Sequence, residues 1–323
     1  MRKLLIIIPF VVAAAYGFVH IAASVGADVN IAPLVVLAPV KGEINAKPFR
    51  AELKEKQRVL DSLFSAQSKL GVFNGCVAVA YHDTLIFQRA YGTENVSTKQ
   101  MLCNESVFQL ASVSKMFTGV AVMKLVEEKK LSVKDPVEKH LPGFSYKGVT
   151  IEHLLTHKSG LPNYLYFYYQ YAKNDSVSFT NARVLEILQE KHPLPYFKPG
   201  RRFQYSNTNY VLLALLIEKL SGQPYQAFLK KEIFDKAGMK HTSFFHPLDT
   251  LPHQTFAFTH RKKQVGTDVL DGVYGDKGIF STTGDMLLFS KALFEGKIIS
   301  SVNVATKPKV YTKYGQFYGY GFR

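Results

Sequence analysis

The sequence predicts an α+β protein in which a block of helices is inserted between strand-forming segments. Two β-rich runs, Cys76–Tyr81 and Leu85–Tyr91, come first, and the short turn His82–Thr84 joins them as a hairpin. A long series of helical patterns follows, and the chain then returns toward strands. We find no internal repeat and no low-complexity tract that would suggest a solenoid or a disordered protein.

The helices are predicted from apolar periodicity and from residues that end a helix. Gly71, Gly222 and Gly238 each follow an apolar segment at the position where a glycine commonly ends a helix. The predicted helices cover residues 49–70, 113–131, 151–157, 180–191, 209–220 and 224–237, and one more begins after residues 282–285.

The N-terminus indicates export. Met1–Lys3 is basic, Leu4–Ala15 is apolar, and Ala13–Ala15 offers small residues at which a signal peptidase could cleave. The apolar stretch also extends to Val25, long enough to span a bilayer as an uncleaved anchor. Both alternatives place the rest of the chain in the periplasm or on the extracytoplasmic face of the membrane. The expected organisation is a signal peptide or anchor (1–25), a linker (26–48) and one domain (49–323) with a helical region at about 113–264.

The composition is that of an ordinary globular protein. Hydrophobic residues make up 47% of the 323 residues and charged residues 20%, which excludes disordered and fibrous classes. The net charge is +15, but the short basic runs do not alternate with aromatic residues as in nucleic-acid-binding proteins. We therefore expect no nucleic-acid partner, and attribute the charge to an anionic cell envelope. We expect a monomer.

Ser112 and Lys115 form the first candidate catalytic pair. They lie three residues apart at the start of the apolar segment Met116–Leu131, so a helix places them on one side of its first turn. A serine hydroxyl becomes a strong nucleophile when a neighbouring base takes its proton, and a buried lysine can be that base. Backbone N–H groups at the helix start could stabilise an oxyanion. An N-cap serine followed by a solvated lysine would give the same pattern.

Tyr205 and Asn207 form the second candidate pair. They are two residues apart on a loop before the apolar helix at 209–220. A phenol can relay a proton, and an amide can hold a substrate carbonyl or orient the lysine. A turn that caps the following helix is the structural alternative.

Together these motifs resemble the serine β-lactamases and penicillin-binding proteins, in particular the branch of class C β-lactamases, D-peptidases and esterases. The resemblance covers roughly residues 70–323 in the order of the family. It is carried by the segments Phe108–Thr118, Thr150–Leu161, Pro199–Tyr210 and Gly278–Met286. It implies an antiparallel sheet flanked by helices, with Ser112 as the acylated nucleophile, Lys115 as its proton acceptor, Tyr205 as acid/base and Asn207 as a substrate-binding amide. It implies no cofactor.

The sequence departs from the family pattern at the third motif. A Lys-Thr-Gly or His-x-Gly triplet is expected on a strand after the segment Tyr318–Phe322, but the chain stops at Arg323. We therefore expect the chain to lack the C-terminal strands and part of the oxyanion hole. Lys158–Gly160 fits the triplet but precedes Tyr205, and we interpret it as a helix end with a glycine C-cap.

The two cysteines and the histidines leave alternatives open. Cys76 and Cys103 could form a disulfide after export, while Cys76 could equally be a free buried thiol in a strand. The cysteines and histidines have no zinc-ligand spacing, and His153 is not followed by the glutamate of a metalloprotease helix. We therefore expect no metal.

The predicted function is that of an exported serine hydrolase, with D-amino-acid peptides, β-lactams or small esters as substrates. The alternative is a non-catalytic relative that binds envelope peptides or partner proteins. The six aromatic residues between Tyr164 and Tyr171 could rim a cleft, although core and surface packing also explain them.

Overall fold

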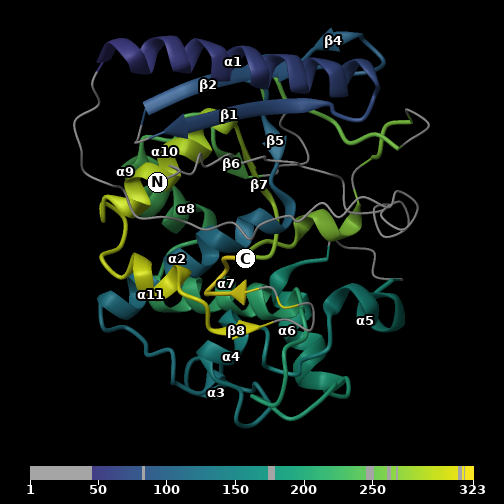
Figure 1. Ribbon diagram of the computed structural model, residues 1–323. Coiled ribbons are helices and arrows are strands. Elements are labelled where there is room, and N and C mark those ends of the chain that lie inside the picture. Colours follow the sequence, from purple (N-terminus) through teal and green to yellow (C-terminus); the bar gives the residue numbers. More distant parts are fainter. Residues whose placement is uncertain are drawn as a thin grey trace. The chain divides into compact units, whose positions relative to one another are not determined.

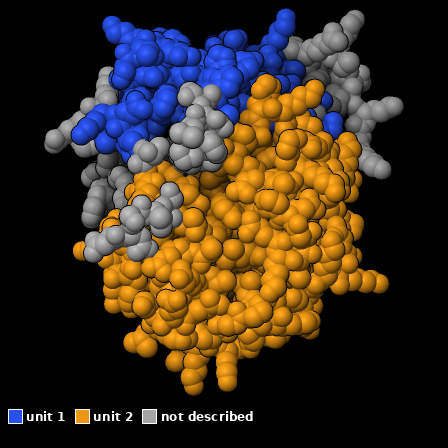
Figure 2. Space-filling view, turned by 180° about the vertical axis from the view of Figure 1, so that it is seen from behind, with its two compact units in different colours: residues 1–109, 248–266, 281–291 blue, residues 110–247, 267–280, 292–323 orange. Residues whose placement is uncertain are grey.

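The structure is a computed structural model that describes residues 46–81, 84–173, 179–244, 251–259, 263–266, 268–311, 315 and 317–323, with side chains from residue 53 onward. The predicted signal peptide or anchor lies outside the described residues. The chain divides into two compact units (Figure 2). Unit 1 comprises residues 1–109, 248–266 and 281–291, and unit 2 comprises residues 110–247, 267–280 and 292–323.

Unit 1 is built around an antiparallel pair of strands, with helix α1 lying along it (Figure 1). Gly75 pairs with Tyr91 and Tyr81 with Thr84, which confirms the predicted hairpin. The described elements of this unit are α1 (Ala46–Lys69), β1 (Gly75–Tyr81), β2 (Thr84–Tyr91), β3 (Thr93–Asn95), β4 (Gln100–Met101), β5 (Phe108–Gln109) and most of α10 (Thr283–Phe294).

The apolar core of unit 1 lies between α1 and the two strands. Leu60 of α1 packs against Val77 and Val79 of β1 and against Ile86 and Phe87 of β2. Alternate residues of a strand point to the same face, so Val77 and Val79 both reach the helix. The amphipathic helix α1 therefore covers one face of this strand pair.

Unit 2 contains most of the helices. Its described elements are α2 (Ser114–Glu127), α3 (Val137–His140), α4 (Ile151–Leu155), α5 (Tyr164–Tyr171), α6 (Asn181–Glu190), α7 (Thr208–Ser221), α8 (Tyr225–Leu229), η2 (Lys230–Phe234), α9 (Asp235–Ala237), β6 (Ser243–Phe244), η3 (Val269–Gly272), β7 (Ile279–Ser281), α11 (Val302–Thr306), β8 (Val310–Tyr311) and β9 (Phe317–Tyr318), together with the one-turn η1 (Ala111–Val113).

Helices α2 and α7 pack against each other in the core of this unit. Both are apolar around most of their circumference, and every residue of α7 from Thr208 to Ala214 is buried. A helix of this kind requires packing on all sides, which the other helices of unit 2 provide. The predicted helical block with an α+β arrangement is confirmed.

The helix predicted for residues 224–237 is interrupted. It begins as α8, widens into the π-helical turn η2, and ends as α9 before Gly238, which has a φ of 76°. Apolar periodicity does not distinguish α from π hydrogen bonding over one turn, so the sequence indicated a continuous helix. The glycine stops at Gly222 and Gly238 are confirmed, since both adopt the left-handed conformation.

The last described residues pack against α2. The Tyr320 N–H donates to the Ala305 carbonyl, and a Cβ on Gly119 of α2 would overlap the Tyr320 carbonyl oxygen. A Cβ on Gly321 would likewise overlap the Lys115 carbonyl oxygen. The absence of side chains at Gly119 and Gly321 therefore permits the close approach of backbone to helix.

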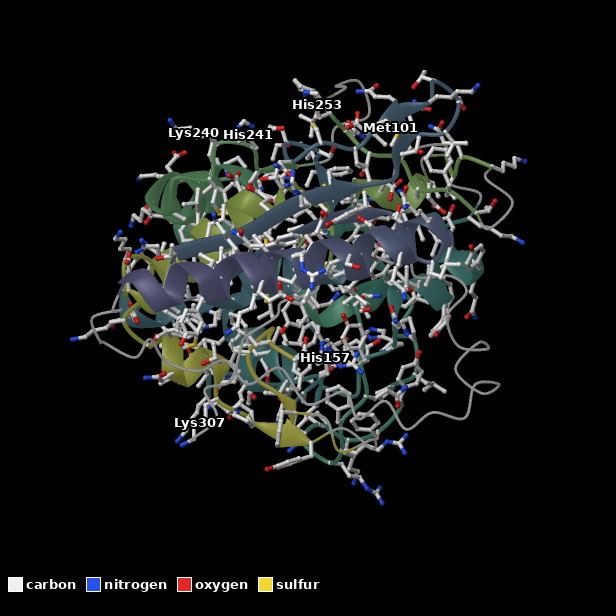
Figure 3. The ribbon with its side chains drawn as sticks, turned by 45° about the horizontal axis from the view of Figure 1, so that its top comes forward. Met101, His157, Lys240, His241, His253 and Lys307 are labelled. Carbon is white, nitrogen blue, oxygen red and sulfur yellow. The ribbon has the colours of Figure 1, made fainter. Side chains whose placement is uncertain are left out.

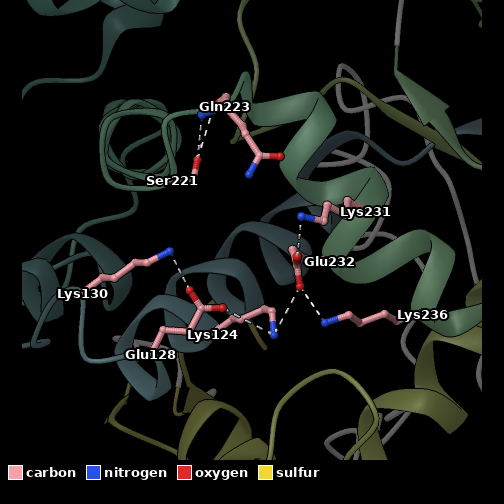
Figure 4. A network of polar contacts seen from close by, with 8 residues as sticks. All are labelled: Lys124, Glu128, Lys130, Ser221, Gln223, Lys231, Glu232 and Lys236. Atoms are coloured by element: carbon pink, nitrogen blue, oxygen red, sulfur yellow. Dashed lines mark hydrogen bonds and ion pairs between the residues drawn. The ribbon is translucent and has the colours of Figure 1, made fainter.

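The carboxylate of Glu232, in η2, forms ion pairs with three lysines, one each from α2, η2 and α9 (Figure 4). Its carboxylate lies 3.4 Å from Lys124, 2.6 Å from Lys236 and 3.7 Å from Lys231. Burial alone would raise the pKa of Glu232, but the hydrogen bond and charge of Lys236, together with Lys124, lower it overall.

Among the described residues, no helix combines the length and the apolar character needed to cross a bilayer.

Candidate active site

Ser112 is exposed on η1, a single 3-10 turn that runs directly into α2. The preceding Ala111 has a φ of 46°, a left-handed conformation that costs free energy for a residue with a side chain. Two hydrogen bonds to β7 hold the turn. The Leu110 N–H donates to the Ile279 carbonyl at 2.8 Å, and the Ile279 N–H donates to Ser114 Oγ at 3.3 Å. The Ser112 hydroxyl is therefore presented on a fixed turn.

Lys115 is buried directly behind Ser112. Its Nζ lies 3.2 Å from Ser112 Oγ and donates to the Asp276 carbonyl oxygen at 2.8 Å. Only 1% of Lys115 is exposed, and its amine lies 5.0 Å from the centre of the Tyr205 ring and 5.6 Å from that of Tyr210. The predicted spacing of Ser112 and Lys115 thus gives a direct contact between hydroxyl and amine, not a solvated lysine.

The backbone donors at the start of α2 differ from the expectation. The Val113 N–H donates to the Leu110 carbonyl, and the Ser114 N–H donates to the Ala111 and Ser112 carbonyls. These two groups are therefore not available to an oxyanion.

Tyr205 lies beside Lys115 at the edge of the site, with 36% of its surface exposed. Asn207 is the N-cap of α7, but its side chain makes no capping hydrogen bond. Its buried Oδ1 has no partner among the described residues. The structure thus brings Ser112, Lys115 and Tyr205 together, and places Asn207 two residues along the same loop with an unused acceptor.

His157 is the residue that the sequence analysis missed. It is fully buried, and its Nδ1 accepts from the Ser206 N–H and from the Asn209 amide, each at 3.2 Å. With Nδ1 an acceptor, the ring proton is on Nε2, which donates to Tyr318 Oη at 3.0 Å. Burial, and then the charge of Lys115, lowers the pKa of His157 well below its ordinary value. His157, labelled in Figure 3, is therefore a neutral support for the loop that carries Tyr205.

The signal for this role was present in the sequence, since the resemblance includes His157 in the segment Thr150–Leu161. A lone histidine does not reveal its partners, however. The His157 carbonyl also accepts from the Gln204 N–H at 2.8 Å, so backbone and side chain of one residue hold the loop.

The segment Lys158–Gly160 does not end a helix, which corrects that prediction. Helix α4 ends at Leu155 with Thr156 as its C-cap, and His157 takes the left-handed conformation at φ 55°. Ser159 is buried and donates to Asn209 Oδ1 at 2.6 Å. Ser159 therefore holds this segment to α7 through Asn209, the residue whose amide also contacts His157.

Asp276 is buried, and its backbone carbonyl is the one that accepts from Lys115 Nζ. Tyr164 Oη donates to its Oδ2 at 2.9 Å, while Oδ1 has no partner among the described residues. Burial raises the pKa of the Asp276 carboxyl, although Lys115 and Lys277 partly oppose this. Burial and Asp276 also raise the pKa of Tyr164.

The aromatic stretch Tyr164–Tyr171 is divided between core and surface. Tyr164, Phe167 and Tyr168 are buried, while Tyr166 and Tyr169 are exposed by 71% and 63%. Packing of one helix face thus accounts for the stretch.

Among the described residues, no group of three metal-binding side chains lies around Ser112. The described chain contains one group of three such side chains, Glu94, Cys103 and His253, and it lies in unit 1. Cys76 and Cys103 are free thiols, so the disulfide alternative is not realised.

Comparison with known proteins decides the family. The pattern of the beta-lactamase family matches residues 60–322. The chain belongs to the beta-lactamase family. It is 34% identical over 286 residues to a penicillin-binding protein of Bacillus subtilis, covering 83% of this chain and 63% of that protein. Protein flp of Staphylococcus aureus is 30% identical over 202 residues, covering 59% of this chain and 39% of that protein.

Solved structures agree with this assignment. A penicillin-binding protein from Bacillus halodurans superposes with a TM-score of 0.67 at 27% identity, covering 80% of this chain and 81% of that one. An octameric penicillin-binding protein homologue from Pyrococcus abyssi gives a TM-score of 0.69 at 28% identity, covering 83% and 64%. D-amino acid amidase from Ochrobactrum anthropi shares the fold, with a TM-score of 0.69 at 22% identity and coverage of 84% and 80%.

These comparisons confirm the predicted fold and family resemblance. The chain spans 63% of the length of the Bacillus subtilis relative and 39% of that of protein flp.

Proposed function

We propose that this chain is the catalytic part of an exported serine hydrolase that forms an acyl-enzyme on Ser112. The observation that carries the proposal is the distance of 3.2 Å between the buried Lys115 amine and the exposed Ser112 hydroxyl. An activated serine requires a nucleophile that substrate can reach and a base that holds its proton, and this pair meets both requirements.

In the proposed first step, Ser112 Oγ attacks the carbonyl carbon of the substrate, and its proton passes to Lys115 Nζ, which acts as the base. The carbonyl oxygen becomes an oxyanion, for which the Ser112 N–H is a donor. The tetrahedral intermediate then collapses, the bond to the leaving group breaks, and the leaving group takes the proton that Lys115 received from Ser112. An ester between Ser112 and the acyl group remains.

Tyr205 is proposed as the acid/base of the second half-reaction. Its ring lies 5.0 Å from Lys115 Nζ, and its partial exposure allows its phenol to reach a bound leaving group or water. Water then attacks the ester carbonyl and passes one proton, through Tyr205, to Lys115. That proton returns to Ser112 Oγ as its bond to the acyl carbon breaks, and the acyl group leaves as a carboxylic acid. Asn207, a half-buried residue on the same loop as Tyr205, is proposed to bind the substrate through its side-chain amide.

The proposed substrates are β-lactams, D-amino-acid peptides and small esters. The name of the Bacillus subtilis relative, a penicillin-binding protein, supports β-lactams as substrates. The name of the Ochrobactrum anthropi structure, a D-amino acid amidase, supports D-amino-acid amides as substrates. Export is proposed from the basic and apolar residues at the N-terminus. Fractionation of cells that express the tagged chain, with N-terminal sequencing, tests export and cleavage.

The decisive experiment is incubation with a fluorescent penicillin and with an activated ester, followed by mass spectrometry of the peptides. We expect an adduct on the Ser112 peptide and no adduct in Ser112→Ala. Ser300→Ala, a substitution outside the proposed site, is the control and should retain the adduct. An adduct on Ser114 or Ser206 would contradict the assignment. A folded protein that binds penicillin reversibly but never forms an adduct would instead support the non-catalytic alternative.

A further inference from the structure

A group of three side chains in unit 1 has the composition of a metal site. Glu94 comes from β3, Cys103 follows β4, and His253 comes from a distant segment of the chain. His253 Nδ1 lies 3.5 Å from Cys103 Sγ and 3.8 Å from Glu94 Oε2, and the three atoms lie within 4.8 Å of one another. Figure 3 labels His253.

The two separations from His253 Nδ1 are close to those expected between the ligands of one small metal ion. Zinc binds sulfur at roughly 2.3 Å and imidazole or carboxylate atoms at about 2.0–2.2 Å, so tetrahedral geometry places two ligand atoms about 3.3–3.6 Å apart. The separations of His253 from the other two ligands are within a few tenths of an ångström of this spacing. A thiolate, an imidazole and a carboxylate together favour zinc over the hard ions magnesium and calcium.

Glu94 is a buried carboxylate, a group that is stabilised by hydrogen bonds and by a neighbouring positive charge. Its side chain is 3% exposed, and Ser106 Oγ donates to its Oε2 at 2.7 Å. Among the described residues, His253 Nδ1 lies 3.8 Å from this carboxylate. A buried carboxylate is costly unless it is paired or coordinates a metal, and a divalent ion would supply that pairing.

The surrounding backbone holds the three ligands in place. The Val107 N–H donates to the His253 carbonyl at 2.8 Å, and the Thr255 N–H donates to the Val107 carbonyl at 2.9 Å. His253 itself has a φ of 55°, a conformation that histidine rarely adopts without a constraint. The pairing thus brings a residue 150 positions away beside Cys103.

Ser106 acts as the support behind the ligands. Its Oγ accepts from the Cys103 N–H at 2.9 Å and contacts Cys103 Sγ at 3.6 Å, in addition to its bond to Glu94. Outer groups that orient ligands in this way are characteristic of metal sites. The neighbouring Cys76 is not a ligand, because its Sγ donates to the Cys103 carbonyl at 3.1 Å.

We propose that Glu94, Cys103 and His253 bind one Zn²⁺ ion, with water as the fourth ligand. The ion would fasten the segment 94–106 to the segment that carries His253, within unit 1. Because the two segments meet in the folded chain, the ion would bind the folded chain in preference to the unfolded one. This preference would stabilise the folded state. Binding requires a thiolate and a neutral imidazole, so affinity should fall in acid.

The first test measures metal binding by the full chain after treatment with a chelator. We expect one Zn²⁺ by isothermal titration calorimetry, and a thiolate-to-cobalt charge-transfer band when Co²⁺ is the probe. Cys103→Ser and His253→Gln should abolish that band or weaken binding by more than about 100-fold, and Ser106→Ala should weaken binding about 10- to 100-fold. His241→Gln is the matched control for the histidine substitution and should bind as the parent does. Cobalt binding without the band, or binding unchanged in Cys103→Ser, would overturn the proposal.

The second test uses the unmodified sequence, so it does not depend on the folding of a variant. Iodoacetamide is applied to the native protein with Zn²⁺, without Zn²⁺ and with Zn²⁺ plus a chelator, and each cysteine peptide is quantified. Zinc should protect Cys103, and the chelator should restore its alkylation. Equal alkylation of Cys103 in all three conditions would overturn the proposal.

Discussion

The imidazole of His157 packs at a tilt of 32° against the ring of Tyr205, with 4.2 Å between ring centres, and its Nε2 donates to Tyr318 Oη. The position of the proposed acid/base therefore depends on a buried ring that never contacts the substrate. His157 also holds the backbone on both sides of this tyrosine, through the Gln204 and Ser206 N–H groups.

Replacement of His157 by glutamine should change the dependence of stability on pH. The folded-state pKa of His157 lies well below the unfolded value of 6.5, because burial and Lys115 disfavour the charged form. The unfolded state then binds the extra proton, so stability is fully present above pH 6.5 and is lost as the pH falls below it. Urea unfolding between pH 7.5 and 5 should show this loss in the parent and a weaker dependence in His157→Gln. His192→Gln, at an exposed histidine, is the control. An identical slope in all three proteins would contradict the prediction.

Lys115→Met and Tyr205→Phe should each lower the rate of ester hydrolysis by about 10²–10⁴-fold, the usual contribution of a positioned acid or base. Because the Lys115 amine lies 5.0 Å from the Tyr205 ring, we expect the two groups to act together in proton transfer. The double variant should therefore lose much less than the product of the single losses. Turnover of an activated ester by the four proteins measures this, and strictly multiplicative losses would mean separate roles.

Gly119→Ala should destabilise the protein although alanine is the better helix former. In an open helix the change would stabilise by about 0.5–1 kcal/mol, but here the new Cβ overlaps the Tyr320 carbonyl oxygen. We expect a net loss of about 1–3 kcal/mol in the free energy of unfolding.

Gly284→Ala is the matched control for that substitution. Gly284 also lies in a helix, and the nearest atom to a Cβ there is 3.7 Å away, so alanine should be neutral or stabilising. Thermal unfolding of both variants measures the change in stability that each substitution causes. A Gly119→Ala protein as stable as the parent would show that the last residues do not pack on α2 in this way.

Glu232→Gln should reduce stability by roughly 1 kcal/mol at low ionic strength, because it removes the carboxylate that Lys124, Lys231 and Lys236 share. The lowered pKa of Glu232 means that its contribution is present above the unfolded value of 4.5 and is lost as the pH falls through the folded pKa.

High salt should shrink the effect of Glu232→Gln, since these charges are partly exposed. Glu190→Gln, at an exposed glutamate at the end of α6, is the control and should change stability little at any salt concentration. A loss in Glu232→Gln that salt does not reduce would point to packing and not to charge.

The sequence determined what depends on neighbours along the chain. Helical spacing places Ser112 and Lys115 on one side of a turn, and a β-rich pair with a short turn forms the hairpin of β1 and β2. The glycines at 222 and 238 end their helices for a local reason, the low cost of a left-handed φ. These features needed no knowledge of tertiary contacts.

Only the tertiary structure decided which distant residues meet. Nothing in the spacing of His157, Tyr205 and Tyr318 indicates that their rings pack together, because long-range contacts are set by how the helices bury their apolar faces. The same reason explains why the sequence revealed no metal site, while the fold brings His253 beside Glu94 and Cys103 through backbone pairing with Val107. Local geometry thus supplies the nucleophile and its base, and packing between distant segments supplies the groups that hold them.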